Sequence, residues 1–123
     1  MRYVHIIVST IGKFIFYFCS GVLLLNLQAM RSSKLYNSLL NEETLKTLTQ
    51  KYHFKGHLGD QDFFTLISME YEELFYILPC GWNRQLCVWW RDHGYEAIFS
   101  QYYDCNEPTH IYHGNCNTPI PDD

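Results

Sequence analysis

Apolar residues dominate the first quarter of the chain. Residues 22–25 form a continuous apolar run within a predicted strand over residues 15–27, and such a run is typical of a strand covered on both faces. The alternative is a membrane anchor or signal over residues 6–27, because a membrane span needs about 20 mostly apolar residues. Lys13 weakens that alternative, since a charge at mid-membrane costs about 2.5–3.5 kcal/mol. Residues 1–17 are treated as a separate apolar N-terminal segment, to which the sequence assigns no role.

Apolar residues then recur at helical spacing. The spacing predicts a helix over residues 28–40 and a second one that begins at Asn41, with acids in its first turn, and ends by Gly56. Residues 74–78 are predicted to form a short strand stopped by Pro79. Strands that alternate with helices indicate an α/β sheet.

A glycine-rich turn leads into Asp60, which is predicted to cap a helix running to about residue 70. The backbone N–H groups and positive dipole at such a helix start suit an anionic or hydroxyl-rich ligand. The simpler interpretation is that Asp60 only caps the helix.

Length and charge narrow the class of protein. At 123 residues the chain is one domain at most, and its 47% hydrophobic content is ample for a core. The net charge is −4, and the nine Lys and Arg residues are not clustered. This pattern excludes a basic surface for nucleic acid.

Four of the five cysteines lie in the last third of the chain: Cys80, Cys87, Cys105 and Cys116. No C-x-x-C spacing or histidine pair supports a structural zinc site. Disulfides in an oxidising secretory compartment explain the four better, with three pairings left open. Reduced, buried thiols in a cytosolic protein are the alternative.

The same region is dense in aromatic and polar residues. Rings that pack on C–H faces beside polar side chains suit a sugar-binding cleft, and this region supplies Asn83, Arg84, Trp89, Trp90, Arg91, His93 and Tyr95. The alternative is that Trp82, Trp89 and Trp90 are core residues beneath a disulfide-bonded loop. Further on, a short strand places His113 before a glycine, where an imidazole can ligate a metal or touch a phosphate. A lone histidine in such a place is more often structural.

Several ordered motifs together resemble the C-terminal half of the family 8 retaining glycosyltransferases. They occupy residues 20–27, 53–64, 80–87, 89–95 and 112–121. The resemblance runs from about residue 18 to residue 122 and is strongest to the family's xylose-transferring members. It implies the C-terminal portion of a GT-A (Rossmann-like) fold in an enzyme of the endoplasmic-reticulum lumen.

The resemblance also implies a reaction and its cofactor. The expected activity is retaining α1,3-transfer of xylose from UDP-xylose onto xylosyl-glucose O-glycans of EGF repeats, as in Notch. His113 matches the family's manganese-ligating histidine. A hard cation would offset the charge of the leaving diphosphate. We therefore expect Mn²⁺ as the cofactor.

The resemblance also implies roles for individual residues. Ser20, Leu58 and Gln61 match donor-sugar contacts, and Trp90 and Asn115 match acceptor contacts, with Gln61 facing both substrates. The Gln61 amide falls where the family places its catalytic group beside the anomeric carbon, and a neutral amide can stabilise an oxocarbenium-like state. The resemblance further favours the disulfide pairs Cys80–Cys105 and Cys87–Cys116.

Two departures from the family pattern change the expectation. The upstream Asp-x-Asp metal motif is missing. Asp60-Gln61-Asp62 only imitates it, because these residues open a helix. In addition, Cys19 replaces the family's usual asparagine. His113 alone should hold manganese weakly, so we expect a fragment with little transferase activity. The alternative is a non-catalytic, disulfide-bonded lumenal domain that binds glycosylated EGF repeats through a cleft at Trp90.

Overall fold

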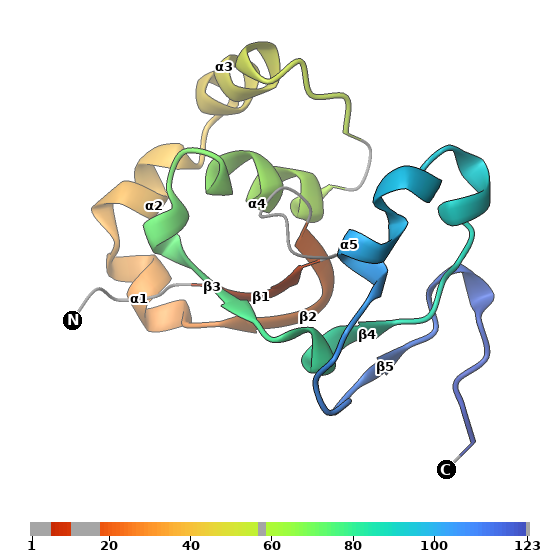
Figure 1. Cartoon of the computed structure of the whole chain (residues 1–123). Coiled ribbons are helices and arrows are strands. Elements are labelled where there is room, and N and C mark those ends of the chain that lie inside the picture. The colour runs from red at the N-terminus through yellow and green to blue at the C-terminus, as the bar shows by residue number, and fades with distance from the viewer. Residues whose placement is uncertain (1–5, 11–17, 57–58, 123) are drawn as a thin grey trace.

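The computed structural model describes residues 6–10, 18–56 and 59–122. Its helices and strands divide between a first part with a three-stranded sheet and a C-terminal part with a two-stranded one (Figure 1). In chain order they are β1 (Ile6–Thr10), β2 (Phe18–Leu25), α1 (Leu27–Ser32), α2 (Lys34–Leu39), α3 (Glu42–Lys51), α4 (Asp60–Ser68), β3 (Phe75–Leu78), β4 (Arg84–Gln85), α5 (Phe99–Tyr103) and β5 (Tyr112–His113).

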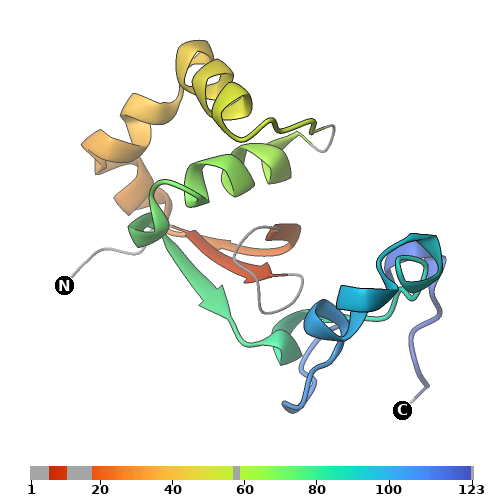
Figure 2. The ribbon, with the colours of Figure 1, turned by 45° about the horizontal axis from the view of Figure 1, so that its top comes forward.

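The first sheet has the order β2-β1-β3. β1 runs antiparallel to β2 and parallel to β3, so that Ile6 pairs with both Leu25 and Phe75. Ile6 is fully buried and joins a core cluster that includes Leu66 and Ile67 of α4. Figures 1 and 2 show α3 and α4 on the same side of this sheet. The α/β prediction is therefore confirmed.

The expectation that β2 is covered on both faces is wrong. β2 lies at the edge of the sheet, and Leu24 is 64% exposed. Leu24 pairs with Ile7, the neighbour of the buried Ile6. Because successive residues of a strand face opposite sides of the sheet, Leu24 belongs to the face that points away from the core.

The helix predicted over residues 28–40 is interrupted. Ser33 adopts an extended conformation and ends α1, and its side chain accepts a hydrogen bond from the Tyr36 N–H at 3.1 Å as the N-cap of α2. Asn41 caps α3 as predicted, accepting from the Thr44 N–H at 2.9 Å. A serine favours such a break because its hydroxyl competes for backbone donors.

Asp60 is not the cap of α4, which corrects the sequence prediction. Gly59 occupies the N-cap position with a φ of 67° and no side-chain hydrogen bond. Asp60 and Asp62 lie in the first turn of the helix. There their charges still complement the positive end of the helix dipole.

Two disulfides organise the C-terminal part. Cys80 is bonded to Cys105 and Cys87 to Cys116, so the pairing favoured by the family resemblance is confirmed. β4 and β5 lie parallel, with Arg84 opposite Tyr112. Within the described ranges, no helix is both long and apolar enough to span a bilayer.

Candidate functional site

The β4–β5 pair brings together side chains that are 30 residues apart in the chain. Gln85 of β4 lies opposite His113 of β5. Asn83 directly precedes β4, and its Oδ1 lies 3.0 Å from Nδ1 of His113. Asn83 is only 2% exposed, whereas His113 is half-buried. A buried amide thus contacts the expected metal ligand.

Asn115 is held by a second group of hydrogen bonds. Its Oδ1 accepts from the backbone N–H groups of Leu86 and Cys87 at 3.1 and 3.0 Å. Its Nδ2 donates to Oε1 of Gln85 at 2.5 Å. The side chain expected to contact the acceptor is therefore fixed in one orientation.

Gln85 completes this network, but its own amide nitrogen is unpaired. The residue is 7% exposed, and Nε2 has no hydrogen-bond partner. A buried donor without a partner is costly, about 1–3 kcal/mol. Such groups are uncommon outside sites that take up water or a ligand.

The chemistry of His113 suits a metal, but its surroundings supply few other ligands. An imidazole nitrogen is a common ligand for transition metals. The described residues contain no group of three or more His, Cys, Asp or Glu side chains that could hold an ion. Among the described residues, His113 is therefore not part of a cluster that could hold an ion by itself.

An aromatic loop over residues 88–98 follows this network in the chain. Trp89 stacks on His93 with ring centroids 3.7 Å apart, and Trp90 makes edge contacts with Trp89 and Tyr95 at 5.0 and 5.3 Å. Trp82, Trp89 and Trp90 are all at least 40% exposed. The alternative that these tryptophans form a core is therefore wrong.

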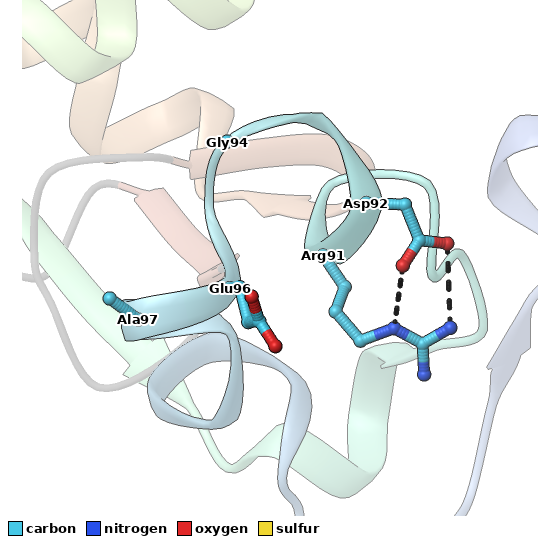
Figure 3. A pocket seen from close by; sticks show the side chains of 5 residues that line it. All are labelled: Arg91, Asp92, Gly94, Glu96 and Ala97. Carbon is cyan, nitrogen blue, oxygen red and sulfur yellow. Dashed lines mark hydrogen bonds and ion pairs between the residues drawn. The ribbon is translucent and has the colours of Figure 1, made fainter.

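A hollow of about 450 Å³ lies on the same loop (Figure 3). Its lining comprises Arg91, Asp92, Gly94, Glu96 and Ala97. Arg91 and Asp92 point toward one another, with Nε 2.9 Å from Oδ1 (Figure 3). The hydrogen bond from Arg91 lowers the pKa of the Asp92 carboxyl.

The other expected site residues lie on different elements. Gln61 is in the first turn of α4 and half-buried, and its backbone oxygen accepts from the Thr65 hydroxyl at 2.8 Å. Ser20 lies in β2, and Leu58 falls outside the described residues. His113 and Asn115 both accept a hydrogen bond from the Leu86 N–H, while Gln61 and Trp90 lie on separate elements.

Sequence reasoning gave no role to Gln85 and placed Asn83 only among the polar residues of a sugar-binding cleft. Both belong to a stretch that contributes to the family resemblance. No local pattern indicates their contacts with His113 and Asn115, because these partners lie 30 residues further along the chain.

Known proteins provide an independent comparison. No protein-family model matches the chain. Over 106 residues, or 86% of this chain, it is 63% identical to xyloside xylosyltransferase 1 of Mus musculus. It is 62% identical to xyloside xylosyltransferase 1 of Homo sapiens over the same length. The chain spans about a quarter of these two enzymes, 27% of each.

The structural comparison agrees. Against the crystal structure of mouse xyloside xylosyltransferase 1 in its apo form, the TM-score is 0.88 with 48% sequence identity. The match covers 96% of this chain and 49% of that one. The expectation that the chain has the C-terminal portion of a GT-A glycosyltransferase fold is confirmed.

Proposed function

We propose, from its similarity to part of xyloside xylosyltransferase 1, that this chain is a portion of a retaining xylosyltransferase. The carrying observation is the 63% identity over 86% of the chain. The full reaction would be α1,3-transfer of xylose from UDP-xylose to xylosyl-glucose on EGF repeats such as those of Notch. Both disulfides support a lumenal, endoplasmic-reticulum location, because disulfides persist in oxidising compartments.

The site residues would contact the donor, the acceptor or both. Asn115 and the exposed ring of Trp90 would contact the acceptor, while Ser20 and Leu58 would contact the donor. Gln61 would serve both, with its amide beside the anomeric carbon. Because the amide is neutral, it would stabilise an oxocarbenium-like state without forming a firm covalent adduct.

His113 would supply one ligand to manganese. Bound there, the cation would offset the charge of the leaving diphosphate. Ligand number and charge set the affinity for such an ion. With His113 as its one matched ligand, this chain would bind manganese weakly by itself.

A second candidate is a non-catalytic lumenal domain that binds glycosylated EGF repeats. The observation in its favour is the exposed aromatic loop, in which Trp89, Trp90 and Tyr95 lie at the surface of a disulfide-bonded unit. Exposed rings with polar neighbours suit sugar faces. Binding by this surface requires no donor.

A chimera tests the first proposal. In mouse xyloside xylosyltransferase 1, the 106 matched residues would be replaced by those of this chain. We expect transfer of xylose to a xylosyl-glucose EGF repeat to be retained, and Gln61→Ala in the chimera to reduce it by orders of magnitude. A folded but inactive chimera, or full turnover by the Gln61 variant, would contradict the proposal.

The 123-residue chain separates the two candidates. It would be mixed with the same EGF repeat, with and without UDP-xylose and Mn²⁺, and with an unglycosylated repeat as the control. Glycan-dependent binding without turnover favours the binding domain. Detectable turnover by this chain would refute the expectation that it is an inactive portion.

A further inference from the structure

Asn83 is a buried residue whose side chain meets the expected metal ligand. It ends the 3₁₀ turn Cys80–Asn83 and is 2% exposed. Its Oδ1 lies 3.0 Å from Nδ1 of His113. The function proposed above gives Asn83 no role.

The chemistry of this contact selects one form of the imidazole. An amide oxygen can only accept a hydrogen bond, so Nδ1 of His113 must carry the proton. A neutral imidazole has a single ring proton, and Nε2 therefore bears the lone pair. A metal needs that lone pair.

We propose that Asn83 is a positioning residue that holds His113 in the Nδ1–H tautomer and presents Nε2 to a divalent metal. The metal part of this inference rests on the function proposed above. The tautomer part rests on the contact alone. Partners of this kind fix the ring orientation of metal-ligating histidines, and their loss typically reduces metal affinity 10–100-fold.

The backbone around Asn83 is restrained on both sides. Arg84 N–H donates to Ile111 O at 2.8 Å and Leu86 N–H donates to His113 O at 3.1 Å. On the other side, the N–H groups of His110 and Ile111 both donate to Gly81 O, at 2.7 and 3.1 Å. These bonds fix the two backbones relative to each other, so ring rotation is the freedom that Asn83 controls.

The test measures the tautomer in the 123-residue chain without metal. Nitrogen-resolved NMR at alkaline pH distinguishes the protonated from the unprotonated ring nitrogen of His113. We expect a protonated Nδ1 in the wild type, and a shift of the proton toward Nε2 in Asn83→Ala. Asn83→Asp keeps an acceptor oxygen and should keep the wild-type tautomer.

Asn106→Ala is the matched control, because Asn106 is exposed and the substitution is the same. A wild-type His113 that is mainly protonated at Nε2 would overturn the inference without any variant. The wild type and Asn83→Asp therefore decide the question even if Asn83→Ala does not fold.

A titration with Mn²⁺ then tests the metal part. Paramagnetic broadening detects weak binding, and we expect the His113 ring signals to broaden before those of the exposed His110. The Mn²⁺ concentration for half-broadening should rise about 10–100-fold in Asn83→Ala. If His113 is protonated at Nδ1 but its ring signals do not broaden selectively with Mn²⁺, the metal role of His113 is overturned. The positioning of His113 by Asn83 would then still hold.

Discussion

Asn115 has a structural role in addition to its expected contact with the acceptor. Its Oδ1 receives two backbone N–H groups, those of Leu86 and Cys87. Loss of the acceptor would leave the Cys87 N–H, in a buried residue, without this partner. A buried donor that loses its partner costs about 1–3 kcal/mol.

We therefore expect Asn115→Ala to reduce the free energy of unfolding by about 1–3 kcal/mol. Asn115→Asp should lose less, because it keeps an acceptor oxygen. Urea unfolding with intact disulfides measures both, and Asn106→Ala at an exposed position serves as the control. Equal stability of Asn115→Ala and wild type would show that these hydrogen bonds contribute nothing.

Gly81 is constrained by space rather than by conformation. A Cβ at this position would lie 2.0 Å from the backbone oxygen of Pro108. That oxygen cannot retreat easily, because the nearby His110 and Ile111 are hydrogen-bonded to Gly81 O. Overpacking of this kind typically costs about 1–3 kcal/mol.

Gly81→Ala is accordingly expected to lower stability and to accelerate amide hydrogen exchange at His110 and Ile111. Gly94→Ala provides the comparison, since Gly94 has a φ of 97° but open space where a Cβ would lie. That variant should be destabilised by backbone strain, without faster amide exchange at His110 and Ile111. Unchanged exchange in Gly81→Ala would mean that the turn accommodates a methyl group.

At the scale of elements, a polar cluster ties the end of α3 to the turn after α4. Glu70 accepts hydrogen bonds from Lys51 and from the Tyr52 hydroxyl, the latter at 2.5 Å. Lys51 and Tyr52 together lower the pKa of the Glu70 carboxyl. The bonds to Glu70 raise the pKa values of Lys51 and Tyr52.

These shifts fix the sign of the pH dependence. Because the pKa of folded Glu70 is lowered, its contribution is present above the unfolded pKa and is lost as the pH falls through the folded value. The contributions of Lys51 and Tyr52 are lost as the pH rises through their raised values. The effect is small, because the cluster is exposed.

Glu70→Gln should therefore lower the Tyr52 pKa and flatten the acid limb of the stability curve. NMR titration of the Tyr52 ring and urea unfolding across the acid range measure the two effects. Glu73→Gln removes the same charge from an exposed position nearby. An equal shift of the Tyr52 pKa in that control would indicate a long-range charge effect instead of the hydrogen bond.

The disulfides connect elements that secondary structure alone does not join. Cys80 and Cys105 are 25 residues apart, and closing a loop of that length restricts the unfolded chain by about 3–4 kcal/mol in the entropic account. We expect Cys80→Ser to lose stability of that order and to expose Cys105 to thiol reagents. Labelling of Cys87 or Cys116 instead would contradict the observed pairing.

Sequence pattern predicted the elements best where local signals were sufficient. The cap at Asn41 and the strand before Pro79 are local features. The break at Ser33 was missed because apolar spacing continues across it, and the assignment of Asp60 was off by one because Gly59 can adopt a positive φ. The Asn83–His113 contact spans 30 residues, and no local pattern encodes it.

At the scale of the whole molecule, α3 and α4 both lie on one side of the first sheet (Figures 1 and 2). Leu24 and Tyr76 both pair with the residue that follows Ile6, so these two side chains lie on the face away from Ile6 and α4. Leu24 is 64% and Tyr76 52% exposed. The continuous apolar run of β2 predicted a strand with both faces covered, because such runs are typical of α/β sheets that carry helices on both faces.

The exposed Leu24 and Tyr76 should make the isolated chain self-associate, because apolar side chains on a sheet face beside an open edge strand favour intermolecular contact. We expect Leu24→Lys to raise the concentration at which oligomers appear in analytical ultracentrifugation, by placing a charge on the exposed apolar face. Leu45→Lys is the matched control, since Leu45 is 41% exposed on α3, away from this face. If both variants change association equally, net charge is responsible. If neither does, the face does not drive association, and the apolar pattern of β2 needs another explanation than a partner surface.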